Sequence, residues 1–228
     1  MTKIDCPSRI RYDEGCLAAH ALNQIGDRWA LLVLRELVFT PKRFQMLRAG
    51  LPGITAGVLT ARLHQMIETG LVFHDPRLGA YGLTERGRGV LPVLEALCRW
   101  ALLLPGHDPS RFISPTALMI SMGVNLQCHR AAGAEFHAGF DFGREAFEMR
   151  LAQGRLQTAA VLKPEGQFIL GGDANRLASA VYGPKSLSEL VAAGKIEATG
   201  DLEAAQRFVD LFALAPQDEG LSSSSRMR

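Results

Sequence analysis

The sequence predicts an α+β fold built from two domains, residues 1–105 and residues 106–228. Three observations support this division. Apolar residues recur at the spacing of amphipathic helices through most of the first domain. From residue 136 they alternate with polar residues, which is typical of strands, and helical spacing returns after residue 174. The stretch 104–109, between the helical and the alternating pattern, is dense in proline and glycine, as linkers are.

The charge of the chain is divided unevenly. Its 228 residues carry a formal net charge of +2, but residues 1–105 hold 13 Lys and Arg against 9 Asp and Glu, and residues 106–228 hold 12 against 14. The basic charge of the first domain favours contact with nucleic acid, whereas the mildly acidic charge of the second domain indicates a function other than DNA binding. The N-terminus lacks the apolar core of a signal peptide, and no apolar run is long enough to span a bilayer. We therefore expect a cytoplasmic protein with no membrane partner.

No pattern in the sequence indicates a metal site or a catalytic site. The four cysteines, Cys6, Cys16, Cys98 and Cys128, lie far apart and form no CxxC pair. A nucleophile elbow, a phosphate loop, a paired-carboxylate motif and a dinucleotide fingerprint are all absent. We expect a protein that is not an enzyme and that needs neither a metal nor a cofactor.

The first domain begins as a series of helices. Apolar spacing predicts helices over residues 16–25, 28–39, 42–48 and 56–69. Thr55 stands where an N-cap belongs, and Gly70 stands where the fourth helix would end. The third and fourth helices, joined by a short turn, have the order of a helix-turn-helix motif.

The fourth predicted helix has a polar face of short side chains with no carboxylate, which would let its backbone lie close to the major groove of DNA. The residues expected to face the groove are Gly57, Thr60, Ala61, His64 and Gln65, with Thr55 at the start of the helix. Arg62 and Arg43 are expected to hold phosphates, which position a protein on DNA without reading its sequence. The alternative is an ordinary surface helix, and the helix-turn-helix context favours the DNA-binding interpretation.

A hairpin and a long helix complete the first domain. Strands are predicted over 71–74 and 81–83, joined by a basic turn, so the hairpin has the form of a wing. Arg77 at its tip would contact the minor groove or a phosphate, or remain a free surface arginine. A helix is predicted from residue 84 to residue 104, and it has more apolar residues than one small domain can bury, which indicates a partner surface.

The first domain resembles the HxlR-type winged helix-turn-helix regulators over roughly residues 14–103. The resemblance rests on the segments Ile25-Gly26-Asp27-Arg28-Trp29, Leu34-Arg35-Glu36-Leu37, Leu51-Pro52-Gly53-Ile54 and Leu83-Thr84-Glu85-Arg86-Gly87. It implies a homodimer that binds double-stranded DNA at a partly palindromic operator, as a repressor. The chain departs from the family in having Leu17 where a proline commonly follows Cys16, and in its shorter wing.

The second domain combines strands with helices. A helix is predicted over 115–128, antiparallel strands over 136–170, helices over 174–182, 186–193 and 202–214, and a disordered tail from about residue 217. The order of these elements and the turns at Gly172-Asp173 and Gly200-Asp201 resemble sterol-carrier-protein-type domains over roughly 113–214. The resemblance implies an antiparallel-sheet-plus-helices ligand domain that holds a small hydrophobic ligand.

The apolar residues of this domain are the candidate ligand-binding set. They are Leu118, Met122, Phe136, Phe140, Phe147, Met149, Phe168, Tyr182 and Phe208. The alternative is a filled core, which is the commoner result of alternating apolar strands. A lipid carrier or lipid-modifying protein is the rival class to a regulator, although the sequence has no catalytic motif for it.

Cys16 is a candidate redox sensor, because a helix start lowers the pKa of a thiol. The HxlR resemblance supports this interpretation, since some members of the family sense oxidants through a thiol at this place. The alternative, which we favour slightly, is an inert small residue beneath a dimer helix.

Overall fold

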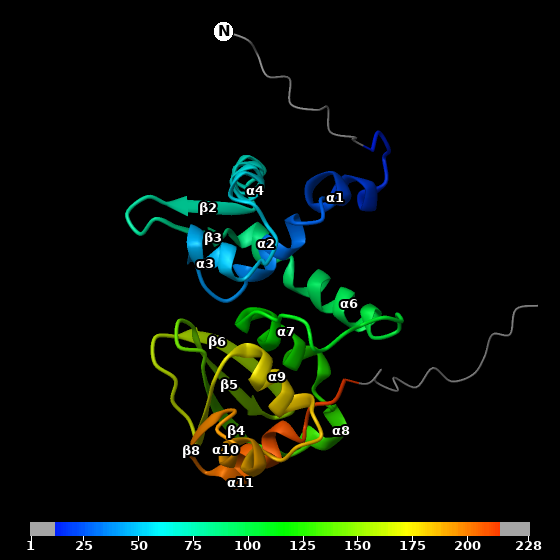
Figure 1. Ribbon diagram of the computed structural model, residues 1–228. Helices are drawn as coiled ribbons and strands as arrows, with labels where there is room; N and C mark the ends of the chain where they lie inside the picture. The colour runs from blue at the N-terminus through cyan, green and yellow to red at the C-terminus, as the bar shows by residue number, and fades with distance from the viewer. Residues whose placement is uncertain (1–11, 215–228) are drawn as a thin grey trace, which may run out of the picture. The chain divides into compact units, whose positions relative to one another are not determined.

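The computed structural model describes residues 12–214, which form two compact units (Figure 1). Unit 1 comprises the chain to Leu37 and Pro41–Val90, and unit 2 comprises Val38–Thr40 and the chain from Leu91 onward. The long helix before the linker is therefore grouped with unit 2, whereas the predicted domain boundary lay at 105/106. The disordered tail predicted from about residue 217 lies outside the described residues.

Unit 1 is a winged helix-turn-helix. Its elements are α1 (Leu17–Ile25), α2 (Ala30–Glu36), β1 (Lys42–Arg43), α3 (Phe44–Ala49), α4 (Ala56–Glu68), β2 (Val72–Asp75), β3 (Ala80–Leu83) and α5 (Glu85–Arg88). The strands form a three-stranded antiparallel sheet in the order β1-β3-β2. The core joins the inner faces of α2, α3 and α4, where Val33, Leu47, Leu59, Leu63 and Met66 are fully buried.

The predicted limits of α4 are confirmed. The Thr55 side chain accepts a hydrogen bond from the Val58 backbone N–H, so it satisfies one of the donors that a helix N-terminus leaves open. Gly70 follows the helix with a positive φ of 69°, a conformation that glycine adopts without a steric penalty. Local chemistry at both ends therefore sets the length of this helix.

Three helices predicted in the first domain differ in the structure. The segment 42–48, expected as one helix, begins as strand β1, because Lys42 and Arg43 pair with Tyr81 and Ala80 of β3 before α3 starts. The helix expected over 28–39 is limited to α2. The helix expected from 84 to 104 is also divided, into α5 and a second helix that starts at Leu91.

Unit 2 places helices on one face of a five-stranded sheet. Its elements are α6 (Leu91–Ala101), α7 (Pro115–Asn125), α8 (Cys128–Ala131), β4 (Phe136–Asp141), β5 (Ala146–Ala152), β6 (Arg155–Val161), β7 (Phe168–Gly171), α9 (Ala174–Tyr182), α10 (Leu187–Ala192), β8 (Glu197–Gly200) and α11 (Leu202–Val209). The strand order is β6-β5-β4-β7-β8. Figure 1 shows the helices and the sheet of this unit. Side chains of α7, α9, α10 and α11 form one buried cluster with alternate residues of the strands.

The sheet of unit 2 is mixed, so the expectation of antiparallel strands throughout is wrong for one pair. Strand β7 runs parallel to β4, because the chain crosses from the edge strand β6 over β5 and β4 before it pairs again. Strand β8, which the sequence did not predict, pairs antiparallel with β7. Helix α7 ends at Asn125 rather than near 128, because Leu126 is extended and forms a bridge with Phe212.

Candidate DNA-binding surface and C-terminal pocket

Helix α4 presents a face of exposed, short side chains. Gly57, Thr60, Ala61 and His64 are all exposed, as predicted, while Leu59 and Leu63 on the opposite side are fully buried. The face therefore offers a hydroxyl, an imidazole and two positions without a long side chain. Such a surface can approach base edges closely and has no carboxylate to repel phosphates.

Gln65 does not belong to this face, which corrects the prediction. Its side chain is only 7% exposed and its amide nitrogen donates to the Gln24 backbone carbonyl at 3.1 Å. Its amide oxygen accepts from Arg62 at 2.6 Å. Gln65 therefore ties α4 to the end of α1, a long-range contact that no local spacing indicates.

Arg62 is also engaged inside unit 1. Its guanidinium lies 3.6 Å from the Asp27 carboxylate and its side chain is 19% exposed. In this conformation the Arg62 side chain holds α4 against the turn before α2. It is therefore not directed outward for the phosphate contact that was predicted for it. Asp27 is itself fixed there, since it accepts a hydrogen bond from the Trp29 backbone N–H.

Two exposed arginines, Arg43 and Arg77, lie at the turn of the wing. The Asp75 carboxylate accepts from the backbone N–H groups of Arg77 and Leu78, which shapes the turn between β2 and β3. The Arg43 guanidinium donates to the Leu78 carbonyl at 3.2 Å, so Arg43 lies against the same turn. The structure thus places Arg43 and Arg77, which were predicted separately, at the same turn.

A buried ion pair connects β1 to α2 inside unit 1. The Lys42 ammonium lies 3.1 Å from the Glu36 carboxylate, and both side chains are fully buried. Arg35 holds the other oxygen of Glu36 at 2.8 Å. The Arg35 guanidinium also donates to the Gly50 carbonyl at 3.3 Å, which connects α2 to the end of α3.

Cys16 is exposed and forms the N-cap of α1. The backbone N–H groups of Ala19 and Ala18 lower the pKa of its thiol, because they stabilise the thiolate. Exposure and a lowered pKa are the properties that favour reaction of a thiol as its thiolate.

The candidate ligand-binding residues form a filled core, which corrects the expectation that they line a cavity. Seven of them are at most 1% exposed, namely Leu118, Met122, Phe140, Phe147, Met149, Phe168 and Phe208, and Phe136 and Tyr182 are partly buried. The Phe208 ring packs against several other aromatic rings of this cluster, with centroids 5.1 to 6.4 Å apart. The interior of unit 2 is therefore occupied by its own side chains.

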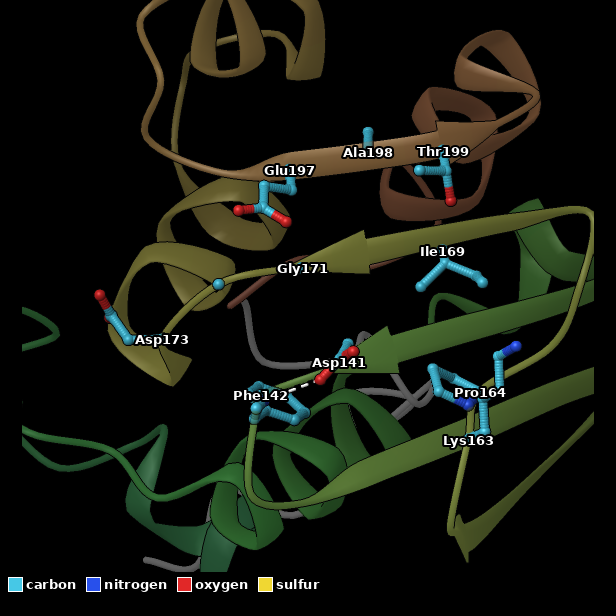
Figure 2. A pocket seen from close by; sticks show the side chains of 12 residues that line it. Asp141, Phe142, Lys163, Pro164, Ile169, Gly171, Asp173, Glu197, Ala198 and Thr199 are labelled. Carbon is cyan, nitrogen blue, oxygen red and sulfur yellow. Dashed lines mark hydrogen bonds between the residues drawn. The ribbon is translucent and has the colours of Figure 1, made fainter.

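A pocket of about 540 Å³ lies elsewhere in unit 2, on the face of the sheet that the helices leave open (Figure 2). It is lined by residues at the ends of β4 and β7, by β8 and by the β6–β7 crossover. None of these residues was predicted as part of a site, and Gly172-Asp173 was predicted only as a turn.

Residues 12–214 contain no cluster of three or more His, Cys, Asp or Glu side chains arranged to hold a metal ion. Within the same residues, no helix is both long and apolar enough to cross a membrane.

Residues 24–105 match the model of the HxlR-like helix-turn-helix family, and residues 107–218 match the model described as alkyl sulfatase C-terminal. An uncharacterised HTH-type transcriptional regulator of Methanothermobacter thermautotrophicus is 36% identical over 99 residues, which cover 41% of this chain and 75% of the relative. One from Mycobacterium tuberculosis is 38% identical over 92 residues, which cover 38% of this chain and 58% of the relative.

Solved structures are similar over less than half of the chain. The quinone-bound YodB of Bacillus subtilis is 28% identical and covers 39% of this chain and 100% of its own, with a TM-score of 0.36. The redox regulator HypR in its oxidised form is 26% identical and covers 40% of this chain and 100% of its own, with a TM-score of 0.37.

Proposed function

The chain belongs to the HxlR-like helix-turn-helix transcriptional regulators, and from that premise we propose that it acts as a homodimeric repressor on a partly palindromic operator. In this proposal α4 enters the major groove and the wing contacts the DNA backbone beside it. The observation that carries the proposal is the exposed, carboxylate-free face of α4 in the same unit as Arg43 and Arg77. The protein would act in the cytoplasm, on the DNA itself, and not as an enzyme.

The DNA contacts are tested on an operator selected from random duplexes by the full-length protein. Arg43→Ala should weaken binding to every sequence and lower the slope of log K against log salt by about 0.9, the value for one phosphate contact. Thr60→Ala and His64→Ala should instead change which operators are preferred, since these residues are placed to read base edges. Arg207→Ala, an exposed arginine of unit 2, is the matched control. Arg207→Ala should keep the slope of the wild type. If Arg43→Ala kept it too, the proposed contact of Arg43 with the DNA backbone would be wrong.

Two helices are proposed as the dimer interface because each exposes apolar side chains. On α1, Leu17 is 85% exposed and Leu22 is 48% exposed. On α6, Trp100 is 58% exposed and Leu97 is 38% exposed. Covering such surface with a second copy is the usual solution for a symmetric regulator. Leu97→Glu should yield monomers in sedimentation velocity and much weaker operator binding, and a dimer of unchanged strength would contradict this interface.

Unit 2 is proposed as a sterol-carrier-type domain that carries the regulatory signal in the form of a small ligand. A sheet covered by helices on one face supports this part of the proposal. Because the interior is filled, a hydrophobic ligand would enter only by displacing side chains of the Phe208 cluster. Mass spectrometry of molecules that remain bound to the purified full-length protein tests it. A lipid recovered at one molecule per chain would support it, and only bare protein would contradict it.

A thiol-sensing regulator is the second candidate, favoured by the exposure of Cys16 and the lowered pKa of its thiol. In this candidate an oxidant converts the Cys16 thiolate to a sulfenic acid or disulfide and thereby changes operator affinity. Operator binding is measured before and after treatment with hydrogen peroxide. A loss that Cys16→Ser abolishes would support it, whereas an equal response of the variant would exclude Cys16 as the sensor.

A further inference from the structure

The pocket of unit 2 lies on the side of the sheet opposite the packed core. Ile169, Gly171 and Asp141 alternate with the buried residues Phe140 and Leu170, so they point away from the helices. Figure 2 shows the side chains of Asp141 and Ile169, with those of Glu197 and Thr199 of β8, around the pocket. The pocket is therefore separate from the hydrophobic interior in which a lipid-like ligand was expected.

The strand register places two carboxylates on either side of a gap. Asp141 of β4 pairs with Gly171 of β7, and Gly171 pairs with Glu197 of β8. Neighbouring strands lie about 4.8 Å apart, so the two acidic residues stand about 10 Å apart across the glycine. A Cβ atom at Gly171 would lie 3.3 Å from the Cβ of Glu197 and 3.6 Å from its Oε2, so the Glu197 carboxylate leans over the glycine. A side chain at position 171 would therefore displace this carboxylate and narrow the gap between it and Asp141.

The wall of the pocket is formed by the β6–β7 crossover, which the sheet holds in place. The Glu148 carboxylate accepts hydrogen bonds from the Glu165 backbone N–H at 3.1 Å and from His137 at 2.8 Å. The crossover also lies directly on Gly139, where an added Cβ would be 3.1 Å from Pro164 and from the Glu165 carbonyl. These contacts fix Lys163 and Pro164 beside the sheet, so the pocket is formed before any ligand binds.

The charges of the pocket are separated along its length. Asp141 and Glu197 lie toward one end, and Lys163 lies toward the other, beyond the apolar side chain of Ile169 (Figure 2). Asp173 is already occupied, because it caps α9 and lies 2.9 Å from Arg176. Glu197, in contrast, is exposed and makes no hydrogen bond or ion pair within residues 12–214, and one oxygen of Asp141 accepts only from the Gly143 backbone N–H.

We propose that this pocket binds a small molecule that carries an ammonium or guanidinium group on a short apolar stem. The cationic group lies in the gap over Gly171, between the carboxylates of Asp141 and Glu197. The stem lies along Ile169 and Pro164, which supply the apolar wall. The volume of about 540 Å³ is in the range of small-molecule sites. The proposal does not depend on DNA binding or on dimer formation, because all of its residues belong to unit 2.

The test uses three probes that share one stem, namely hexylammonium, 1-hexanol and hexanoate, titrated into the full-length protein by calorimetry at low salt. Hexylammonium should bind at least fivefold more tightly than hexanol, and hexanoate should bind most weakly. The amide signals of residues 141–143, 163 and 197–199 should move in a nitrogen–proton correlation spectrum. Equal affinity for hexylammonium and hexanol, no binding of hexylammonium, or signals that move elsewhere would each overturn the proposal.

Substitutions of the pocket residues test whether hexylammonium binds between Asp141 and Glu197. Asp141→Asn and Glu197→Gln should each weaken hexylammonium about two- to fivefold, as expected for exposed charge pairs, without affecting hexanol. Glu203→Gln, an exposed carboxylate on α11, is the matched control. Gly171→Ala should weaken hexylammonium by closing the gap, whereas Gly123→Ala, where an added Cβ meets nothing within 4 Å, should not. Unchanged affinity in the combined Asp141→Asn and Glu197→Gln variant would overturn the proposal even if hexylammonium binds.

Discussion

Removing the ammonium of Lys42 should destabilise unit 1 severely. Lys42→Met leaves the fully buried Glu36 carboxylate with Arg35 as its remaining cation. Breaking a buried ion pair by removing one partner costs about 3–5 kcal/mol, a large share of the roughly 5–15 kcal/mol that a domain has. With a urea m value of about 2 kcal/mol/M, the midpoint of unfolding should fall by about 2 M.

The measurement follows Trp29 fluorescence in urea, in a Trp100→Phe background, so that the signal comes from unit 1. Arg48→Met is the control, because it removes an exposed cation from α3 of the same unit. The double variant Lys42→Met with Glu36→Leu should recover most of the loss, since it removes the buried carboxylate as well, and Arg35 is 21% exposed and can turn to solvent. A single variant within about 1 kcal/mol of the wild type, or a double variant no better than the single, would refute the reasoning.

Two further predictions concern titratable groups. Burial raises the pKa of Tyr182 to about 12, although the hydrogen bond with Ser121 at 2.9 Å acts to lower this pKa. Stability should therefore be intact below about pH 10, where unfolded tyrosine still holds its proton, and should fall by up to about 2 kcal/mol as pH rises through 12. Urea unfolding of the wild type and Tyr182→Phe checks this, and identical slopes against pH would contradict it. Cys16 should react with iodoacetamide with a midpoint at lower pH than free cysteine, since backbone N–H groups stabilise its thiolate and lower its pKa. Peptide mass spectrometry across pH measures the rate, and a midpoint at or above that of free cysteine would count against it.

The sequence by itself determined the features that depend on neighbours along the chain. Thr55 and Gly70 predicted both ends of α4, because capping and a positive φ are local properties. Helical spacing placed Thr60 and His64 on the exposed face of α4, which the structure confirms. The period change after the linker likewise separated the strands of unit 2 from the helices of unit 1.

Tertiary structure alone decided where distant residues meet. Lys42 and Arg43 became a strand because β3, almost 40 residues later, supplies their backbone partners and Glu36 supplies a buried countercharge. Gln65 turned inward because the Gln24 carbonyl needs a donor, although its position on the helix resembles that of its exposed neighbours. The parallel pairing of β7 with β4 brought Asp141, Gly171 and Glu197 side by side. Spacing along a chain cannot predict such meetings, because strand pairing depends on which long-range partner satisfies the backbone and buries the most apolar surface.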